Sequence, residues 1–283
     1  MANFISVLVR SRNDEAFVGA TLRAILGQDC PIPFEVVNCD DASEDSTPEI
    51  IKSFPQVKVL PRPEGKYIPG RRLNYMIQNC SGSIVVFNNA DAVPCNEHWL
   101  ANLVEPLLKN EADAVYGNQL PRKDAAYLVR KDNLRAFGDG TVAAKWRFFF
   151  SLATSAARRD DLLANPFNEE IRYSEDVEWA HRRNMRIVYA KDALVEHSHN
   201  YTIKELKKRF YGEGYADGQI FSERPSLLRE LAAGAKETMR DAVFLFANPK
   251  GMKELLTAPI RRFVQKYYHW KGVKDYVRDT TQN

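Results

Sequence analysis

Acidic and amide side chains follow two apolar runs, where buried strands of an α/β protein would end. Asp40 and Asp41 follow FEVVNC, and Asn89 and Asp91 follow SIVVF. A carboxylate at the end of a buried strand is costly unless it is paired or binds a metal ion. Asp40 and Asp41 could accept hydrogen bonds from a base edge or ribose, or could be turn residues that cap the next helix. Asp91 could bind a cation that bridges a diphosphate, or could be a turn residue before Pro94.

A second acidic group lies in SEDVEWAHR, residues 174–182. Glu175 and Asp176 fall in the first turn of a predicted helix, where acids suit the positive end of the helix dipole. A carboxylate placed beside a sugar hydroxyl could instead act as a general base. Trp179 and Arg182 fall three and six residues after Asp176, near its face of the helix.

Two histidines, His197 and His199, are separated by one residue in VEHSHN. In a strand, alternate residues share a face, so the pair could bind a metal ion or contact phosphate. Each could equally be a structural histidine.

These residues need elements that hold them, and the first 120 residues provide a regular alternation. Apolar runs rich in β-branched residues predict strands at 4–10, 34–41, 57–62, 83–89 and 112–120. Apolar residues at helical spacing predict helices at 14–28, 45–54, 70–80 and 96–110. Such alternation with short links predicts a parallel sheet covered on both faces, with ligands outside the carboxyl ends of its strands.

The alternation fails after residue 120. We predict a loop-like and aromatic segment at 130–150, an acidic and then helical segment at 168–183, and two short strands within 185–200. A basic, aromatic helix at 205–221 follows, and the rest is helical and amphipathic.

Composition narrows the class of protein. The chain of 283 residues is 45% hydrophobic, which suits one large domain or one domain with an appendage. None of the four cysteines forms a C-x-x-C pair, which argues against a zinc site of the usual spacing. The N-terminus reads as a strand rather than a signal peptide, and no run reaches 18 apolar residues. We therefore expect a cytoplasmic protein.

Taken together and in this order, the motifs resemble the family 2 glycosyltransferases, which have the nucleotide-sugar-binding GT-A fold. The segment EVVNCDDASEDST is similar to the family's Val-Asp-Asp-Gly-Ser-x-Asp-x-Thr, which implies that Asp40 or Asp41 holds the base and ribose. Arg10, Ser11 and Asn13 stand where the family has Pro-Thr-Tyr-Asn, with Arg10-Ser11-Arg12 in place of Pro-Thr-Tyr.

The same resemblance places further donor-side and acceptor-side residues. The segment GRRLNYMIQNCSGSIVVF implies that Arg72 and Asn74 lie near the donor. In FNNADAVP, Asn89 stands for the first acid of the family's Asp-x-Asp metal motif, and Asp91 keeps the second. The resemblance implies a divalent cation, Mg²⁺ or Mn²⁺, at Asp91 and His197; the amide of Asn89 is a weaker ligand than a carboxylate, which puts the cation in question.

On the acceptor side, the resemblance makes Asp176 the catalytic base with Glu175 beside it. Trp179, Arg182 and His199 would then lie on the acceptor or diphosphate side, with His199 in reserve for His197. Ala92-Val93-Pro94, Trp99-Leu100 and the segment Tyr116–Pro121 resemble a subset of bacterial rhamnosyltransferases.

The resemblance implies an inverting glycosyltransferase. It would move a sugar from a nucleoside-diphosphate sugar, dTDP-rhamnose or a UDP-sugar, to a hydroxyl of a glycan or lipid-linked acceptor in bacterial surface polysaccharide synthesis. The alternatives on this fold are a nucleotidyltransferase and a non-catalytic nucleotide-sugar-binding protein.

We predict a GT-A domain at residues 1–215, with a mainly parallel α/β sheet flanked by helices. Its halves are 1–120 for the nucleotide sugar and 121–215 for the acceptor, and a basic amphipathic helical extension follows at 216–283. From Tyr201 onward there are 16 Lys/Arg against 10 Asp/Glu, whereas the first 200 residues have 24 against 27. The tail could lie on the inner face of a membrane, pair two subunits as a homodimer, or be a solvated helical surface. Its basic residues match no known nucleic-acid-binding motif.

Overall fold

The computed structural model describes residues 3–146, 148–222 and 225–281, and the chain divides into two compact units. The first unit consists of Met1–Arg122, Arg135–Glu170 and Glu175–His197. The second consists of Lys123–Leu134, Ile171–Ser174 and Ser198–Asn283. The predicted boundary at residue 215 falls inside α8 (Ile203–Phe221), which belongs to the second unit.

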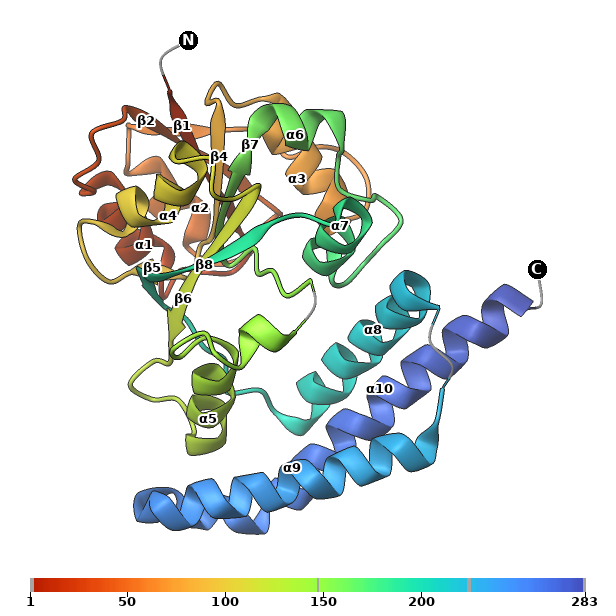
Figure 1. Ribbon diagram of the computed structural model, residues 1–283. Coiled ribbons are helices and arrows are strands. Elements are labelled where there is room, and N and C mark those ends of the chain that lie inside the picture. The colour runs from red at the N-terminus through yellow and green to blue at the C-terminus, as the bar shows by residue number, and fades with distance from the viewer. Residues whose placement is uncertain (1–2, 147, 223–224, 282–283) are drawn as a thin grey trace. The chain divides into compact units, whose positions relative to one another are not determined.

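The described residues of the first unit form an eight-stranded sheet in the order β3-β2-β1-β4-β7-β6-β8-β5 (Figure 1). Its strands are β1 (Ile5–Ser11), β2 (Phe34–Asp40), β3 (Val57–Val59), β4 (Ile84–Asn89), β5 (Val93–Pro94), β6 (Ala114–Leu120), β7 (Thr154–Arg158) and β8 (Ile187–Glu196). Strands β1 to β4 pair in parallel, and β6 pairs in parallel with β8. Strand β7 runs antiparallel to both β4 and β6, so β4 and β6 point the same way.

Helices cover both faces of this sheet. On one face, α1 (Val18–Leu26), α2 (Thr47–Lys52) and α4 (Trp99–Leu108) bury residues such as Leu22, Ile51 and Leu103 against alternate strand residues. On the other face, α3 (Pro69–Gln78), α6 (Arg159–Ala164) and α7 (Glu175–Arg183) do the same. The predicted α/β architecture with a mainly parallel sheet is confirmed.

The second half of the sequence departs from prediction in three places. The segment 130–150 contains the end of α5 (Tyr127–Ala136) and the short helix η1 (Ala143–Lys145), although we expected a loop. Strand β7 and helix α6 were not predicted. The two short strands expected within 185–200 are one strand, β8, because a register shift at Gly117/Asn118 of β6 lets the pairing continue past the polar Lys191-Asp192.

Long helices dominate the second unit: α8, α9 (Leu227–Ala247), η2 (Pro249–Leu256) and α10 (Ala258–Thr281). Thr202 and Glu205 form a capping box that begins α8. Helices α8 and α10 approach closely at Gly214 and Gly272, where a Cβ would lie 2.1 Å from the His269 carbonyl oxygen and 2.3 Å from that of Tyr211, respectively. Among the described residues, no helix is long and apolar enough to cross a membrane.

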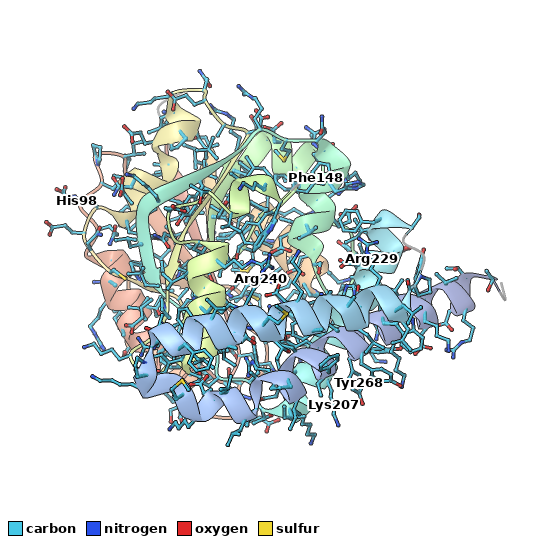
Figure 2. The ribbon with its side chains drawn as sticks, turned by 60° about the horizontal axis from the view of Figure 1, so that its bottom comes forward. His98, Phe148, Lys207, Arg229, Arg240 and Tyr268 are labelled. Carbon is cyan, nitrogen blue, oxygen red and sulfur yellow. The ribbon has the colours of Figure 1, made fainter. Side chains whose placement is uncertain are left out.

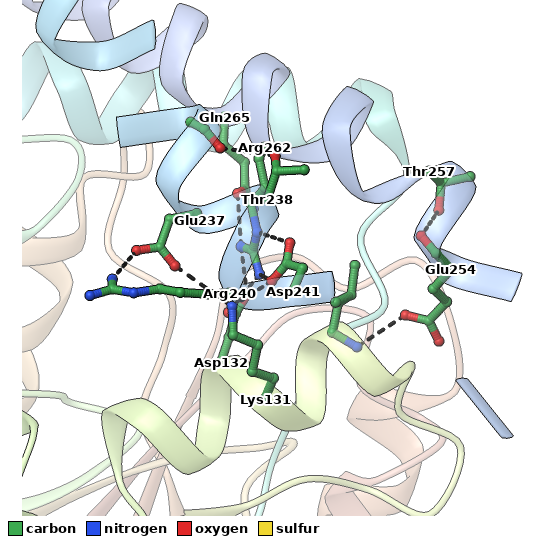
Figure 3. Close-up of polar contacts among 12 residues, drawn as sticks. Lys131, Asp132, Glu237, Thr238, Arg240, Asp241, Glu254, Thr257, Arg262 and Gln265 are labelled. Carbon is green, nitrogen blue, oxygen red and sulfur yellow. Dashed lines mark hydrogen bonds and ion pairs between the residues drawn. The ribbon is translucent and has the colours of Figure 1, made fainter. Parts of the chain in front are cut away.

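A buried charge cluster joins α5, α9 and α10 within the second unit (Figure 3). Arg262 contacts Asp132 at 2.8 Å and Asp241 at 2.7 Å, and Lys131 contacts Asp241 at 2.5 Å. Burial alone would lower the pKa of Arg262, but its hydrogen bonds to Asp241 and Asp132 outweigh that effect and raise it. The ion pairs within the cluster therefore keep its side chains charged despite their burial.

Candidate active site

Five strand ends converge at one edge of the sheet, since β1, β2, β4, β6 and β8 all point the same way. A cavity of about 250 Å³ lies at this edge. Of the predicted site residues, those that line it are Arg10, Ser11, Asp41, Arg72, Asn89 and Asp91. These residues lie together because the carboxyl ends of parallel strands meet at the same edge of the sheet.

The two acids after β2 have different surroundings. Asp40 accepts hydrogen bonds from the hydroxyls of Ser11 at 2.9 Å and Ser43 at 2.6 Å, and from the Ser43 amide at 2.8 Å. This is the turn chemistry that the sequence allowed as an alternative. Asp40 shapes the loop, and Asp41 faces the cavity.

Asp41 is buried and held by two arginines. Its Oδ1 accepts from Arg72 Nη2 at 2.6 Å and from Arg62 Nε at 3.0 Å. Arg72 is itself buried, and its Nε has no hydrogen-bond partner in the described structure. A buried donor at a cavity wall is costly to leave unsatisfied, which favours a polar ligand at this place.

Arg10 connects the β4 end of the cavity to the start of α7. Its guanidinium lies 3.4 Å from Asn89 Oδ1, 3.4 Å from Glu175 Oε1 and 3.4 Å from the Tyr67 hydroxyl. Burial lowers the pKa of Arg10, but Tyr67 and Glu175 outweigh that effect and raise it. Arg10 therefore stays cationic while it links Asn89, a predicted donor-side residue, to the predicted catalytic pair.

Asp91 lies between a guanidinium and an imidazole. Arg122 donates to the Asp91 carbonyl oxygen and to its Oδ2 at 3.2 Å, and the guanidinium lies over the Phe17 ring at 3.8 Å. On the other side, His197 Nε2 lies 3.4 Å from Asp91 Oδ1. His197 Nδ1 lies 2.8 Å from Oε1 of Gln119, whose own amide donates to Ser151.

This arrangement fits a divalent cation. Gln119 presents its carbonyl oxygen to His197 Nδ1, an arrangement that favours a proton on Nδ1 and directs Nε2 toward Asp91. Nε2 and Asp91 Oδ1 lie 3.4 Å apart, a spacing that a shared cation or proton would stabilise. A carboxylate oxygen and an imidazole nitrogen can both bind Mn²⁺, and the oxygen alone is the kind of ligand Mg²⁺ prefers.

Asp176 has a perturbed acidity. Burial, and next the neighbouring Glu175 carboxylate, raise the pKa of Asp176 to about 7, against hydrogen bonds from the Val177 and Leu152 amides that lower it. Glu175 and Asp176 begin α7 directly after Ser174, which has a positive φ of 57°. An acid with a pKa near neutrality is suited to accept a proton at physiological pH.

Nine predicted site residues do not line the cavity, and Asp40, Glu175, Asp176 and His197 among them are described above. The other five have structural contacts of their own. Asn13 and Asn74 make hydrogen bonds to the backbone. Asn13 accepts from the Glu44 amide, and Asn74 donates to the Phe167 carbonyl oxygen and accepts from the Phe167 amide. Trp179 is fully buried and donates to the Asn165 carbonyl, and Arg182 pairs with Glu178. His199 belongs to the second unit and stacks on Tyr201.

The sequence analysis missed three residues that the structure brings to the site, Arg122, Tyr67 and Asp14. Arg122 directly follows the motif ending at Pro121, so its position at the end of β6 was the available signal. Tyr67 lies in the loop before α3, where no pattern marked it. Asp14 lines the cavity, and burial, together with the repulsion of Asp91, Asp45 and Asp40, raises its pKa to about 6.

Comparison with known proteins identifies the class. Residues 6–165 match the family model described as "Glycosyl transferase family 2". The chain therefore belongs to glycosyl transferase family 2. A curated relative, "O-antigen chain rhamnosyltransferase WbaN" of Salmonella anatum, is 26% identical over 201 residues, which cover 64% of this chain and 62% of that protein. The match thus spans about three fifths of that relative's length.

Solved structures share the fold. The mannosyltransferase PcManGT from Pyrobaculum calidifontis, solved with GDP-Man and Mn²⁺, aligns with a TM-score of 0.69 at 19% identity over 99% of this chain and 88% of that chain. Glucosyl-3-phosphoglycerate synthase from Mycobacterium tuberculosis aligns with a TM-score of 0.56 at 20% identity over 77% of this chain and 80% of that chain. The predicted glycosyltransferase class and GT-A-like fold are confirmed.

Proposed function

We propose that the protein is an inverting glycosyltransferase that moves a sugar from a nucleoside-diphosphate sugar to a hydroxyl of a glycan or lipid-linked acceptor. The observation that carries the proposal is that Asp41 and Asp91 line one cavity together with Arg10, and that Arg10 also contacts Glu175, the neighbour of Asp176. The rhamnosyltransferase relative supports dTDP-rhamnose as donor, and the solved neighbours with GDP-Man or UDP-Glc support other nucleotide sugars. The same relative supports the proposal of a role in surface polysaccharide synthesis.

The donor would lie along the strand ends. Asp41, held by Arg72, accepts hydrogen bonds from the base or ribose, and the unsatisfied Nε of Arg72 can donate to the same ligand. Arg10 and Arg122 place two positive charges beside Asn89 and Asp91, where the diphosphate would lie. Guanidinium groups suit phosphate oxygens because their donors are fixed in a planar fork.

Asp176 would act as the base. Its pKa of about 7 keeps a substantial fraction ionised at neutral pH yet makes it a strong enough base to take a proton from the acceptor hydroxyl. The acceptor oxygen forms a bond to the anomeric carbon as the bond to the diphosphate breaks, and the proton moves to Asp176. Arg10 and Arg122 stabilise the negative charge that develops on the leaving diphosphate.

A divalent cation, held by Asp91 and His197, would supply further positive charge to that diphosphate. The neutral amide of Asn89 accepts a hydrogen bond from Arg10. Arginines would therefore supply part of the positive charge that a cation bound by two carboxylates would otherwise supply to the diphosphate.

Thermal stabilisation by UDP, dTDP, GDP and CDP, each with and without Mn²⁺, tests the donor site. A diphosphate at a hundred times its Kd should stabilise the wild type by about 2.7 kcal/mol. Asp91→Ala should lose the Mn²⁺-dependent part of that stabilisation, whereas Glu97→Ala, an exposed acid on the same unit, should behave like the wild type. Absence of stabilisation by all four diphosphates would overturn the proposal.

A further inference from the structure

An exposed apolar stripe runs along α9. Leu228, Ala232, Ala235, Met239, Val243 and Phe246 are all exposed and recur every three or four residues, so they share one face of the helix. Leu228 is 81%, Val243 72% and Phe246 66% exposed. The opposite face carries the buried Gly234, Asp241 and Leu245. The stripe is about 27 Å long at 1.5 Å per residue.

Helix α10 carries a matching stripe beside it. Ile260, Phe263 and Tyr267 are exposed at the same spacing, and Lys271, Lys274 and Arg278 continue that face toward the end of the helix. The Phe263 ring packs against Gly234 of α9, so the two helices lie side by side (Figure 2). Leu256 of η2, 83% exposed, lies between the two helices in the sequence.

Charge along this segment is segregated. Among the described residues from 227 to 274, the exposed charged side chains are Arg229, Lys236, Arg240, Lys250, Lys253, Lys271 and Lys274, all basic. The acids of the same stretch are buried or half-buried and engaged within the second unit. Glu230 pairs with Lys266, Glu237 with Lys131 and Arg240, and Asp241 with Lys131 and Arg262, while Glu254 accepts from the Tyr127 and Leu128 amides. The solvent-facing surface is thus apolar at its centre and cationic at its margins.

We propose that the exposed stripes of the neighbouring helices α9 and α10, here called together the α9–α10 face, bind the surface of an anionic lipid bilayer. Aliphatic and aromatic side chains on an amphipathic helix enter the boundary between headgroups and acyl chains, and lysines and arginines beside them attract anionic headgroups. The helices lie on the bilayer rather than cross it. This inference depends on the second unit alone and is independent of the reaction proposed above.

The charge pattern distinguishes the bilayer from other occupants. In a two-fold dimer through this face, the basic margins of both copies would meet like charge, because the exposed acids needed to pair with them are missing from described residues 227–274. A nucleic acid would match the charge, but it offers no apolar surface to cover Val243, Phe246 and Ile260. An anionic bilayer satisfies both features.

Sedimentation with large unilamellar vesicles tests the proposal. The wild type should bind vesicles of phosphatidylcholine with about 30% phosphatidylglycerol, bind phosphatidylcholine alone much more weakly, and be released by salt. Val243→Asp and Phe246→Asp should each lower the partition coefficient by about tenfold, since each places a charge in the apolar centre. Leu163→Asp in α6, a leucine that is 41% exposed in the first unit, is the matched control and should bind like the wild type.

The lysines of α10 and the oligomeric state of the protein can be tested separately. Lys271→Gln with Lys274→Gln should weaken binding to anionic vesicles, whereas Lys52→Gln with Lys66→Gln, also exposed, should not. Circular dichroism confirms that each variant is folded. A wild type that fails to bind anionic vesicles overturns the proposal, and so does binding that Val243→Asp and Phe246→Asp leave intact. A wild-type dimer in sedimentation velocity that Val243→Asp converts to monomer, without vesicle binding, would assign the face to self-association.

Discussion

At the scale of single residues, three acids of the candidate site pair with arginines, whereas Asp176 is held by backbone amides. Asp41 pairs with Arg72, Glu175 with Arg10 and Asp91 with Arg122, whereas Asp176 accepts hydrogen bonds from the Val177 and Leu152 amides. An acid that is half-buried beside another carboxylate holds its proton more tightly. Asp176 therefore differs from the three arginine-paired acids and is suited to proton transfer.

That separation predicts a pH dependence for the Glu175–Asp176 pair. Because burial and Glu175 raise the pKa of Asp176 to about 7, the fraction of ionised base falls as pH drops below that value. We expect kcat/KM to fall about tenfold per pH unit below neutrality and to level off above it. Asp176→Asn should lower kcat by about 10²–10⁴-fold and keep donor binding. Near-wild-type turnover in this variant, or a profile flat down to pH 5, would remove Asp176 as the base.

Arg122 offers a second prediction at this scale. Its guanidinium neutralises Asp91 from one side while His197 approaches from the other. Arg122→Met removes the charge and keeps an unbranched side chain beside Phe17. We expect the affinity for nucleoside diphosphates without metal to fall about tenfold. Mn²⁺ should raise that affinity more in the variant than in the wild type, because the guanidinium no longer competes with Mn²⁺ for Asp91.

Titration calorimetry with and without Mn²⁺ measures both effects, with Arg23→Met as the control at an exposed arginine of α1 outside the cavity lining. Equal affinities in Arg122→Met and the wild type would place Arg122 outside the diphosphate site.

At the scale of elements, the sequence predicted the first half of the sheet well and the second half poorly. Strands β1 to β4 are apolar runs separated by amphipathic helices, so local periodicity alone identifies them. Strand β7 has only five residues, TSAAR, and its burial depends on the neighbours β4 and β6 that it separates. Such a strand is defined by pairing between distant segments, which no local pattern reveals.

The candidate site divides in the same way. Asp41, Asn89 and Asp91 were predictable because they end or follow strands with clear patterns. Arg122 and Tyr67 were not predictable. Arg122 follows β6, whose place in the sheet depends on β7 lying between it and β4, and Tyr67 lies in a loop. Trp179 matched a motif, yet it packs in the core against Phe150 and Phe167, so its type and spacing did not reveal its surroundings. Its predicted place beside the acceptor stays a prediction.

Helix pairing in the second unit gives an element-scale prediction. A Cβ at Gly272 would lie 2.3 Å from the Tyr211 carbonyl oxygen and 2.6 Å from the Tyr215 amide nitrogen, both of which are backbone atoms of α8. Because backbone cannot rotate away, Gly272→Ala must push α8 and α10 apart, at a cost of about 1–3 kcal/mol. Gly234→Ala is the matched control, since its Cβ would meet only the Phe263 ring and Lys266 side chain at 3.3 Å or more.

Thermal unfolding should show a clear loss for Gly272→Ala and a much smaller change for Gly234→Ala, which also gains helix propensity. Equal Tm values for the two variants would mean that the α8–α10 contact is looser than the structure has it.

At the scale of the whole molecule, the chain forms two units, and the first contains more of its residues than the second. The candidate site lies in the first unit, whereas the second unit is made from three separate segments of the chain. Its first segment, Lys123–Leu134, meets the C-terminal helices through the charge cluster of Lys131, Asp132, Asp241 and Arg262 (Figure 3). These ion pairs therefore connect parts of the chain more than 100 residues apart.

The stability of the second unit should depend on the charge balance of that cluster. Asp241 is fully buried, and it is the acid that both Lys131 and Arg262 contact. Asp241→Ala leaves two buried cations side by side with only Asp132 and Glu237 to offset them, which we expect to destabilise the unit by about 3 kcal/mol. Hydrogen exchange should rise in peptides from α9 and α10, and peptides from β1 and β4 should exchange as in the wild type, since the two units have separate cores. Asp275→Ala, which removes a less buried acid of α10, should have a far smaller effect. If exchange in the sheet rises together with exchange in the helices, the two units unfold as one cooperative molecule rather than as the separate bodies that their cores indicate.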